Sequence, residues 1–160
     1  MKNNEKIKEI RDDALHEKKR HADIMFAYNV YPCTIPLDFA FVPLHWQDSF
    51  EIVYVKRGKG IVQVDFDTYE AEAGDIFIVL PGHLHGLRQC KDERMEYENI
   101  IFDKSFLGHD IVDLCSQKYL QPLINEKISI PVFIRHDHEM HAAVSSSLDK
   151  MNVTRIVVAH

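Results

Sequence analysis

Through the middle of the chain, apolar and β-branched residues form short segments separated by Gly, Pro, Asp or charged residues. Short segments bounded by turn-forming residues are typical of β-strands. The pattern predicts strands at residues 24–31, 39–42, 50–55, 61–66, 69–71, 76–80, 85–89 and 95–102. About eight short strands with frequent turns predict an all-β sandwich or barrel.

The residues between these segments predict how the strands are joined. Turns are predicted at residues 56–60, 67–68, 72–75 and 81–82, and a charged loop at residues 91–94. The first turn contains Gly58 and Gly60, so we expect the strands on either side of it to form a hairpin. Pro32 and Pro36 should end the first strand, and Pro43 suits an edge or strand-end position.

Helical spacing appears at both ends of the chain. Residues 5–20 are mostly charged, with a thin apolar stripe, so they predict a helix that either packs on a partner chain or frays in solvent. A second helix is predicted from near Asp110 to just before Pro122, with a stripe of Ile111, Leu114, Cys115 and Tyr119. A third should begin at an Asp137 N-cap, with a stripe of Met140, Val144, Leu148 and Met151.

Composition narrows the class of protein. The 160 residues suit one domain, and 46% hydrophobic content excludes a disordered chain. A net charge of −6 argues against nucleic-acid binding by this chain itself. Cys33, Cys90 and Cys115 include no C-x-x-C pair, which favours free thiols in a reducing compartment. With neither a signal peptide nor a membrane-spanning run, we expect a cytoplasmic protein with no membrane partner.

One polar group stands out from the strand pattern. His45, Gln47 and Glu51 share one parity, so in a continuous strand their side chains would point to the same face. Burying them requires a partner, and His85 is the candidate. The four residues suit a divalent transition metal such as Zn, Ni, Fe or Mn. They equally suit a metal-free polar pocket, in which Glu51 pairs with a protonated His45 or His85.

Other polar residues have a functional and a structural interpretation. Arg88 could clamp an anionic effector, or lie on a strand surface. Trp46 should cover an outer sheet face, and His83 should be a solvated loop residue. Three further histidines near the last predicted helix are interpreted as solvated, and these are His136, His138 and His141.

The spacing of these residues resembles the two cupin motifs. H-x-Q-x3-E-x6-G from His45 to Gly58 resembles the first motif, and Gly74, Gly82 and His85 match the second. The chain departs from the motifs where Phe39 replaces glycine, Leu80 replaces proline and Gln47 replaces histidine. The resemblance implies a mainly β cupin fold, a double-stranded β-helix or jelly-roll barrel. It also implies a ligand set of His45, Gln47, Glu51 and His85. The amide oxygen of Gln47 is a poorer ligand for these metals than the imidazole usually found there.

Within the cupins, three stretches resemble the N-terminal sensing domain of AraC-type transcriptional regulators. They are HWQDSFEIVYVKRGKG, AGDIFIVLPGHLHG and ENIIFDKSFL. Together with the helical pattern before it, the resemblance predicts a helical leader at residues 1–22, a cupin barrel at 23–104 and a helical segment for dimerisation or linkage at 105–160. In that family a helix-turn-helix domain binds DNA, and since no stretch here resembles one, we expect that domain to be absent from these 160 residues.

Two functions follow as expectations. The first is a small-molecule-sensing and homodimerisation domain, whose effector contacts His45, Gln47, Glu51, His85 and Arg88. Its helical stripes are dimer surfaces or pack on the β-domain of the same chain. The alternative is a small metal-dependent cupin enzyme of the dioxygenase or isomerase type, against which Gln47 and the trailing helices count.

Overall fold

The structure is a computed structural model that describes residues 13–18, 28–107, 114 and 116–158, with residues 152–158 described by their backbone alone. Its strands are β1 (Tyr28–Ile35), β2 (Phe41–His45), β3 (Phe50–Val64), β4 (Asp67–Glu72), β5 (Ile76–Val79), β6 (His85–Gln89), β7 (Met95–Phe102) and β8 (Phe133–Ile134). Its helical elements are η1 (Asp13–Leu15), α2 (Lys104–Leu107), η2 (Ser116–Leu120), α3 (Gln121–Ile124) and α4 (His141–Val158).

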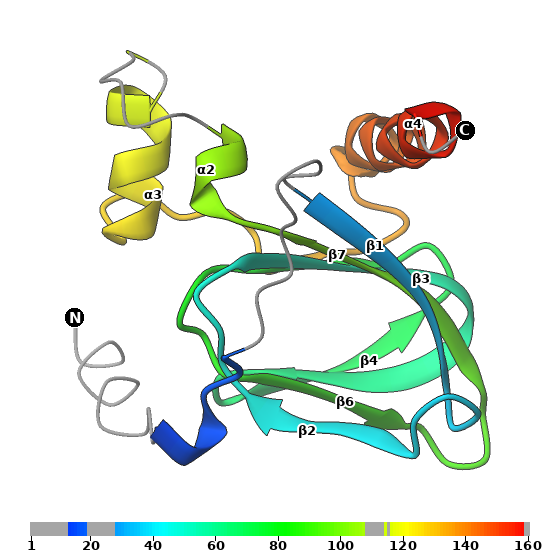
Figure 1. Cartoon of the computed structure of the whole chain (residues 1–160). Helices are drawn as coiled ribbons and strands as arrows, with labels where there is room; N and C mark the ends of the chain where they lie inside the picture. The colour runs from blue at the N-terminus through cyan, green and yellow to red at the C-terminus, as the bar shows by residue number, and fades with distance from the viewer. Residues whose placement is uncertain (1–12, 19–27, 108–113, 115, 159–160) are drawn as a thin grey trace.

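Two antiparallel sheets face each other and share one strand. The first sheet has the order β1-β7-β3-β5-β8. In the second sheet, β2 pairs with β6, and the last part of β3 pairs with β6 and with β4. Figure 1 shows β1 and β7 in one layer, with β2, β6 and β4 in the layer below. This arrangement confirms the predicted barrel of short antiparallel strands.

The predicted hairpin around residues 56–60 is wrong, because β3 runs without interruption from Phe50 to Val64. Its first part pairs with β5 and β7, and its last part pairs with β4 and β6, so one strand passes from one sheet into the other. A register shift between Val55 and Arg57 and a positive φ of 74° at Gly58 mark the bend. Gly58 therefore bends a strand where the sequence suggested a turn.

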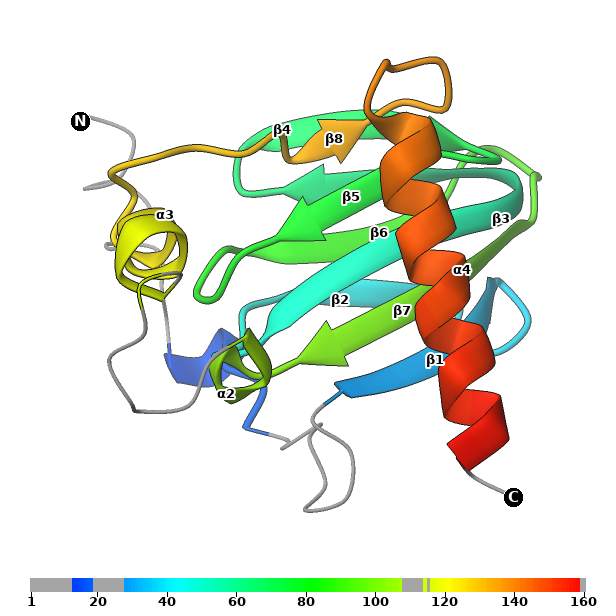
Figure 2. The ribbon, with the colours of Figure 1, turned by 90° about the horizontal axis from the view of Figure 1, so that it is seen from above.

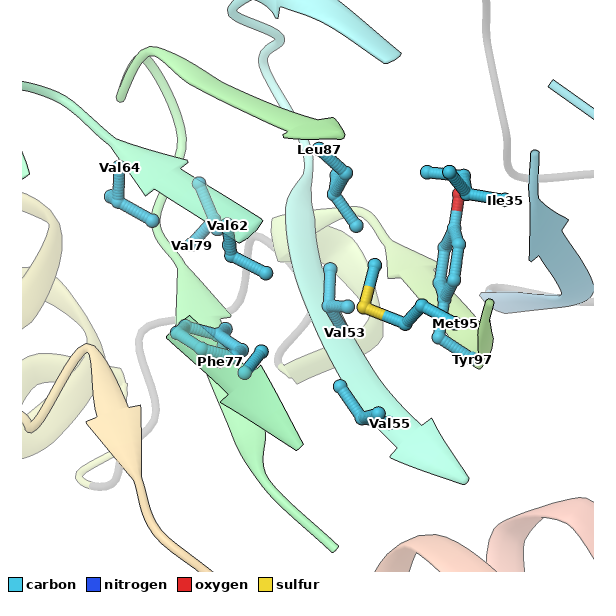
Figure 3. Close-up of a cluster of buried hydrophobic side chains, with 11 residues drawn as sticks. Ile35, Val53, Val55, Val62, Val64, Phe77, Val79, Leu87, Met95 and Tyr97 are labelled. Carbon is cyan, nitrogen blue, oxygen red and sulfur yellow. The ribbon is translucent and has the colours of Figure 1, made fainter. Parts of the chain in front are cut away.

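The interior between the sheets is filled by side chains of alternating strand positions. Val53 and Val55 of β3 point inward and meet Met95 and Tyr97 of β7 and Leu87 of β6 (Figure 3). These residues are buried, and all come from segments that the sequence predicted as strands. Apolar alternation thus fixes which face of each strand points inward.

The outer face of the first sheet is covered by α4. Leu148 is buried there, with Val144 and Met151 partly buried beside it. Figure 2 shows α4 lying across this sheet. The predicted stripe is confirmed for these three residues, which pack on the barrel of their own chain. Met140 is largely exposed, because the helix begins at His141 and not after Asp137.

Two of the edge strands, β1 and β2, each carry a proline. β1 forms the end of its sheet and continues through Pro32, which the sequence placed at its end. A residue without an N–H is tolerated there because an edge strand leaves one side unpaired. Pro43 lies in β2, another edge strand, within an irregular register between Val42 and His45. The edge position predicted for Pro43 is confirmed.

The helical segments differ from their predictions. Of the expected 5–20 helix, the described part is the short η1, after which His16 forms an isolated bridge with Trp46. The second predicted helix does not stop before Pro122, because Pro122 lies in the first turn of α3, where its missing N–H costs little. Of its stripe, Ile111 and Cys115 lie outside the described residues, while Leu114 and Tyr119 are 82% and 56% exposed.

Among the helices of the described ranges, none is long and apolar enough to cross a membrane.

Candidate functional site

The centre of the site is a buried pair formed by Glu51 and His85. Glu51 lies near the start of β3 and His85 at the start of β6, so each sheet supplies one partner. Glu51 Oε2 lies 2.8 Å from His85 Nε2, and the two residues are 2% and 1% exposed. A carboxylate this deeply buried requires such a partner.

Both members of the pair carry charge. His85 Nδ1 lies 3.1 Å from the His83 carbonyl oxygen, and its Nε2 lies against the Glu51 carboxylate. Both neighbours are oxygen atoms, and the His83 carbonyl can only accept, so this arrangement favours a proton on each ring nitrogen and a cationic imidazole beside an ionised Glu51. Burial opposes this charge, but the Glu51 carboxylate and its hydrogen bond raise the pKa of His85 above its ordinary value. Burial likewise opposes the charge of Glu51, yet the charge and hydrogen bond of His85 lower its pKa.

Two amides complete the surroundings of Glu51. Gln47 Nε2 donates to Glu51 Oε2 across 2.6 Å, and Asn99 of β7 also hydrogen-bonds the carboxylate. Gln47 Oε1 and Asn99 Oδ1 are buried without a hydrogen-bond partner among the described residues. Sequence reasoning missed Asn99, although it shares the inward parity of Tyr97 and Ile101 in an apolar strand. Two unpaired carbonyl oxygens beside a carboxylate make a site rich in acceptors.

His45 lies against this pair from the end of β2. Its ring centroid is 4.2 Å from that of His85, and Nδ1 donates to the Pro43 carbonyl oxygen across 2.9 Å. Nε2 lies 3.4 Å from a carboxylate oxygen of Glu17. His45, Gln47 and Glu51 converge as predicted, but from β2, the following loop and β3, not from one continuous strand.

Three of the predicted residues form a potential metal site. One ligand atom from each of His45, Glu51 and His85 lies within 4.8 Å of the others, so the cluster could hold a metal ion. Gln47, whose Oε1 is buried without a hydrogen-bond partner among the described residues, is a candidate for a fourth ligand. Two imidazoles, a carboxylate and an amide oxygen fit a divalent first-row metal.

The cluster opens into a cavity of about 930 Å³, a volume suited to a small organic ligand. His45 and Glu51 line the cavity, while His85 and Gln47 lie behind them. The remaining lining comes from β1, β2, the loop between them, β7 and the N-terminal segment, and consists of Ala14–Glu17, Tyr31–Cys33, Asp38, Phe39, Phe41–Leu44, Tyr97, Asn99 and Ile101. The cavity therefore lies between the edge strands β1 and β2.

The N-terminal segment closes one side of this cavity. His16 stacks on Trp46 with centroids 3.9 Å apart and an interplanar angle of 8°. His16 Nε2 also lies 3.0 Å from Asp48 Oδ2. Trp46 thus binds the N-terminal segment, whereas the sequence predicted that it covers an outer sheet face.

The side chains of Arg88 and His83 do not join the cluster. Arg88 is exposed on β6 and does not line the cavity. His83, predicted to be solvated, lies 2.7 Å from Asp65 Oδ2, so that prediction is wrong.

The three C-terminal histidines differ in whether they contact the barrel. His136 contacts the buried Asp75 at 3.1 Å, and His141 donates to the Gly74 carbonyl oxygen across 2.6 Å. His138 is exposed as predicted and makes no contact to the barrel among the described residues, whereas His136 is exposed but keeps its contact to Asp75. His136 and His141 tie the start of α4 to the turn before β5.

Cys33 and Cys90 are free thiols, as predicted, and Cys115 lies outside the described residues. Burial raises the pKa of the Cys33 thiol, so it stays protonated where it lines the cavity.

Solved structures similar to this chain include two cupins. A cupin protein from Bacteroides fragilis is 24% identical and has a TM-score of 0.46, with 55% of this chain and 80% of that chain covered. A cupin 2 conserved barrel domain protein from Salinispora arenicola is 17% identical with a TM-score of 0.43, covering 57% and 72%.

A curated relative matches part of the chain. The uncharacterized HTH-type transcriptional regulator YdeC of Bacillus subtilis is 28% identical over 75 residues, which are 46% of this chain and 26% of that protein. The chain thus spans about a quarter of the length of this relative.

A family model covers most of the domain described above. The model of the AraC-like ligand binding domain matches residues 36–154, a range that includes β2 to β8 and most of α4. The architecture is the predicted mainly β cupin fold, accompanied by short helical elements and the longer α4. The chain belongs to the AraC-like ligand-binding domain family.

Proposed function

We propose that this domain senses a small molecule in the cavity between β1 and β2 and passes the binding state to a DNA-binding domain of a transcriptional regulator. The observation that carries the proposal is the buried Glu51–His85 pair, whose Glu51 lines a cavity of about 930 Å³ and is hydrogen-bonded by two amides with unpaired oxygens. Apolar walls with a few convergent polar groups are typical of ligand sites.

The N-terminal segment offers a route by which binding changes the protein. Glu17 contacts His45 inside the cavity, and His16 stacks on Trp46 at its border. A ligand that contacts His45 competes with or adds to the Glu17 contact, so it favours one position of the segment over another. A ligand shifts such an equilibrium only by its difference in affinity for the two positions.

Ligand binding is tested by a thermal-shift screen followed by titration of each hit. Cys33→Phe places a ring in the cavity and should weaken binding by more than about tenfold, because the space is no longer available. Thr68→Phe adds the same bulk on exposed β4 and is the matched control. Equal binding to both variants, or a screen without a hit, would contradict the proposal.

The regulatory step is tested on the longer protein that carries this domain. A hit should change its DNA affinity in a gel-shift assay, and Cys33→Phe should remove that response while DNA binding itself persists. The same protein should be a homodimer, for which the exposed Leu114 and Tyr119 offer an apolar surface. Leu114→Glu should shift a dimer toward monomer in sedimentation velocity.

Metal binding is a separate proposal on the same residues. A divalent ion held by His45, Glu51 and His85, with Gln47 beside them, would supply positive charge and open coordination positions for an effector. Metal analysis of protein prepared without a nickel column, combined with melting temperatures with and without chelator, tests it. If no metal is found and none raises the melting temperature, both this proposal and the metal-dependent enzyme are refuted.

A further inference from the structure

We propose that the cavity selects an organic cation, an ammonium or guanidinium group on an apolar or aromatic body. The inference rests on the proposed function, since it names the chemical class of the effector. It is carried by the charges, the unpaired acceptors and the aromatic rings that line the cavity.

The carboxylates that line the cavity are not matched by lysine or arginine side chains in the described lining. Glu17, Asp38 and Glu51 line the cavity, and the described lining residues include no lysine or arginine. Arg88, the cation that the sequence suggested for an anionic effector, is exposed on β6 outside the lining. Carboxylates are ionised near neutral pH, so the lining attracts a cation and repels an anion.

The histidines offset only part of this charge. The cationic His85 neutralises Glu51, with which it forms the 2.8 Å pair. His45 faces Glu17 at 3.4 Å, and His16 pairs with Asp48, which does not line the cavity. Asp38 accepts from the Thr34 backbone N–H across 2.7 Å, a neutral donor that leaves its charge in place. Even with His45 protonated, the lining therefore keeps a net negative charge.

The polar groups at the inner end also require a donor. Asn99 lines the cavity and directs its amide nitrogen to Glu51, which leaves its Oδ1 buried and unpaired among the described residues. An N–H of a ligand would satisfy such an oxygen, whereas a carboxylate or phosphate would bring a further acceptor. The unpaired side-chain atom of this lining residue is thus an acceptor, which favours a ligand with a donor.

Aromatic rings provide surfaces for the rest of a cation. Tyr31 and Tyr97 line the inner part of the cavity, and Phe39 and Phe41 lie at its border and are half exposed. Burial raises the pKa of Tyr97, so its ring stays neutral. A cation over such ring faces is stabilised by the ring quadrupole, and an apolar body packs against the same rings.

The test compares three probes that share one body and differ in head group: phenethylammonium, phenethyl alcohol and phenylacetate. Binding to the whole chain is measured by ligand-observed NMR up to millimolar concentration, with chelator present. The ammonium should bind about tenfold more tightly than the alcohol, and the carboxylate should not bind. Binding of the carboxylate as tightly as the ammonium, or binding of none of the three, overturns the inference.

Variants that remove a single carboxylate distinguish the effect of charge in the cavity lining from the effect of the net charge of the protein. Glu17→Gln should weaken ammonium binding by about fivefold, and the double variant Glu17→Gln with Asp38→Asn should weaken it further. Asp92→Asn removes one negative charge from an exposed loop and should leave binding unchanged. Equal effects of Asp92→Asn and Glu17→Gln would overturn the inference. A neutral or anionic hit from the thermal-shift screen that Cys33→Phe blocks would refute the cation class and still support the proposed sensing function.

Discussion

The buried carboxylate of Glu51 is stable in this fold because three side chains converge on it. His85 supplies a cation at 2.8 Å, and the amides of Gln47 and Asn99 donate to it. The price is that two amide oxygens remain unpaired beside a cavity. A polar group arranged in this way at the end of an apolar interior indicates a site kept for binding.

The pair predicts a specific pH dependence of stability in chelator-treated protein. The pKa of His85 is raised from its ordinary value of 6.5, so its contribution is full below 6.5 and is lost as pH rises through the raised value. The pKa of Glu51 is lowered from 4.5, so its contribution is present above 4.5 and is lost as pH falls through the lowered value. Urea unfolding across this range should show the free energy of unfolding declining on both sides.

Glu51→Gln is the matched variant for that measurement. It keeps the shape of the side chain but removes its charge, and should cost on the order of 3 kcal/mol of stability at the optimum. The difference between wild type and variant should shrink at alkaline pH, where His85 loses its proton. A difference that stays constant across pH would show that the pair is not ionised.

Among the residues of the site, the sequence predicted the convergence of three strand residues but did not predict the roles of Asn99 and His83. Parity and spacing pointed to His45, Glu51 and His85, which do converge. Asn99 was missed because a single amide in an apolar strand is also common on an exposed face. The prediction that His83 is solvated was wrong because its partner Asp65 lies eighteen residues away, before β4 and β5, and the sequence does not show that the two residues meet.

At the scale of elements, β3 determines where the site lies. Its first part places Glu51 in one sheet, and its last part pairs with the strand that carries His85 in the other. A sequence with two glycines between apolar segments predicts a hairpin as readily as a bent strand, because both use positive φ. Only the pairing with β5, β6 and β7 distinguishes them.

The bend predicts different costs for two glycine substitutions. A Cβ at Gly58 would collide with the Arg94 backbone carbonyl and require a positive φ, so Gly58→Ala should destabilise the fold by about 2 kcal/mol or more. At Gly60 the collision is with the flexible Met95 side chain, which can move, so Gly60→Ala should cost less. Thermal or urea unfolding of both variants tests this, and an equal cost would contradict it.

Helix α4 is the second element whose role can be measured. Leu148 is buried against the outer face of the first sheet, so Leu148→Ala should cost about 3 kcal/mol through lost burial and a cavity. Ser146→Ala, on the exposed face of the same helix, should be close to neutral. Equal unfolding midpoints for the two variants would show that α4 does not pack on the barrel in solution.

At the scale of the whole molecule, the interior of the barrel is divided. Val53, Val55 and Leu87 fill one part, and the Glu51 cluster and the cavity occupy the part bordered by the edge strands and the N-terminal segment. Strand alternation predicted the barrel and the facing of its core. It did not predict that the edges of β1 and β2 would leave space for a ligand, because cavity shape depends on how the two sheets meet.

The central claim is that an effector binds in this cavity beside the Glu51–His85 pair. Histidine side-chain NMR tests it directly, because the protein carries its own control. Adding a hit from the screen should shift the imidazole signals of His45 most and of His85 next, while the signals of His136 and His141, beside the turn before β5, stay unchanged. Saturable binding that shifts His136 and His141 but leaves His45 and His85 unchanged would contradict the account.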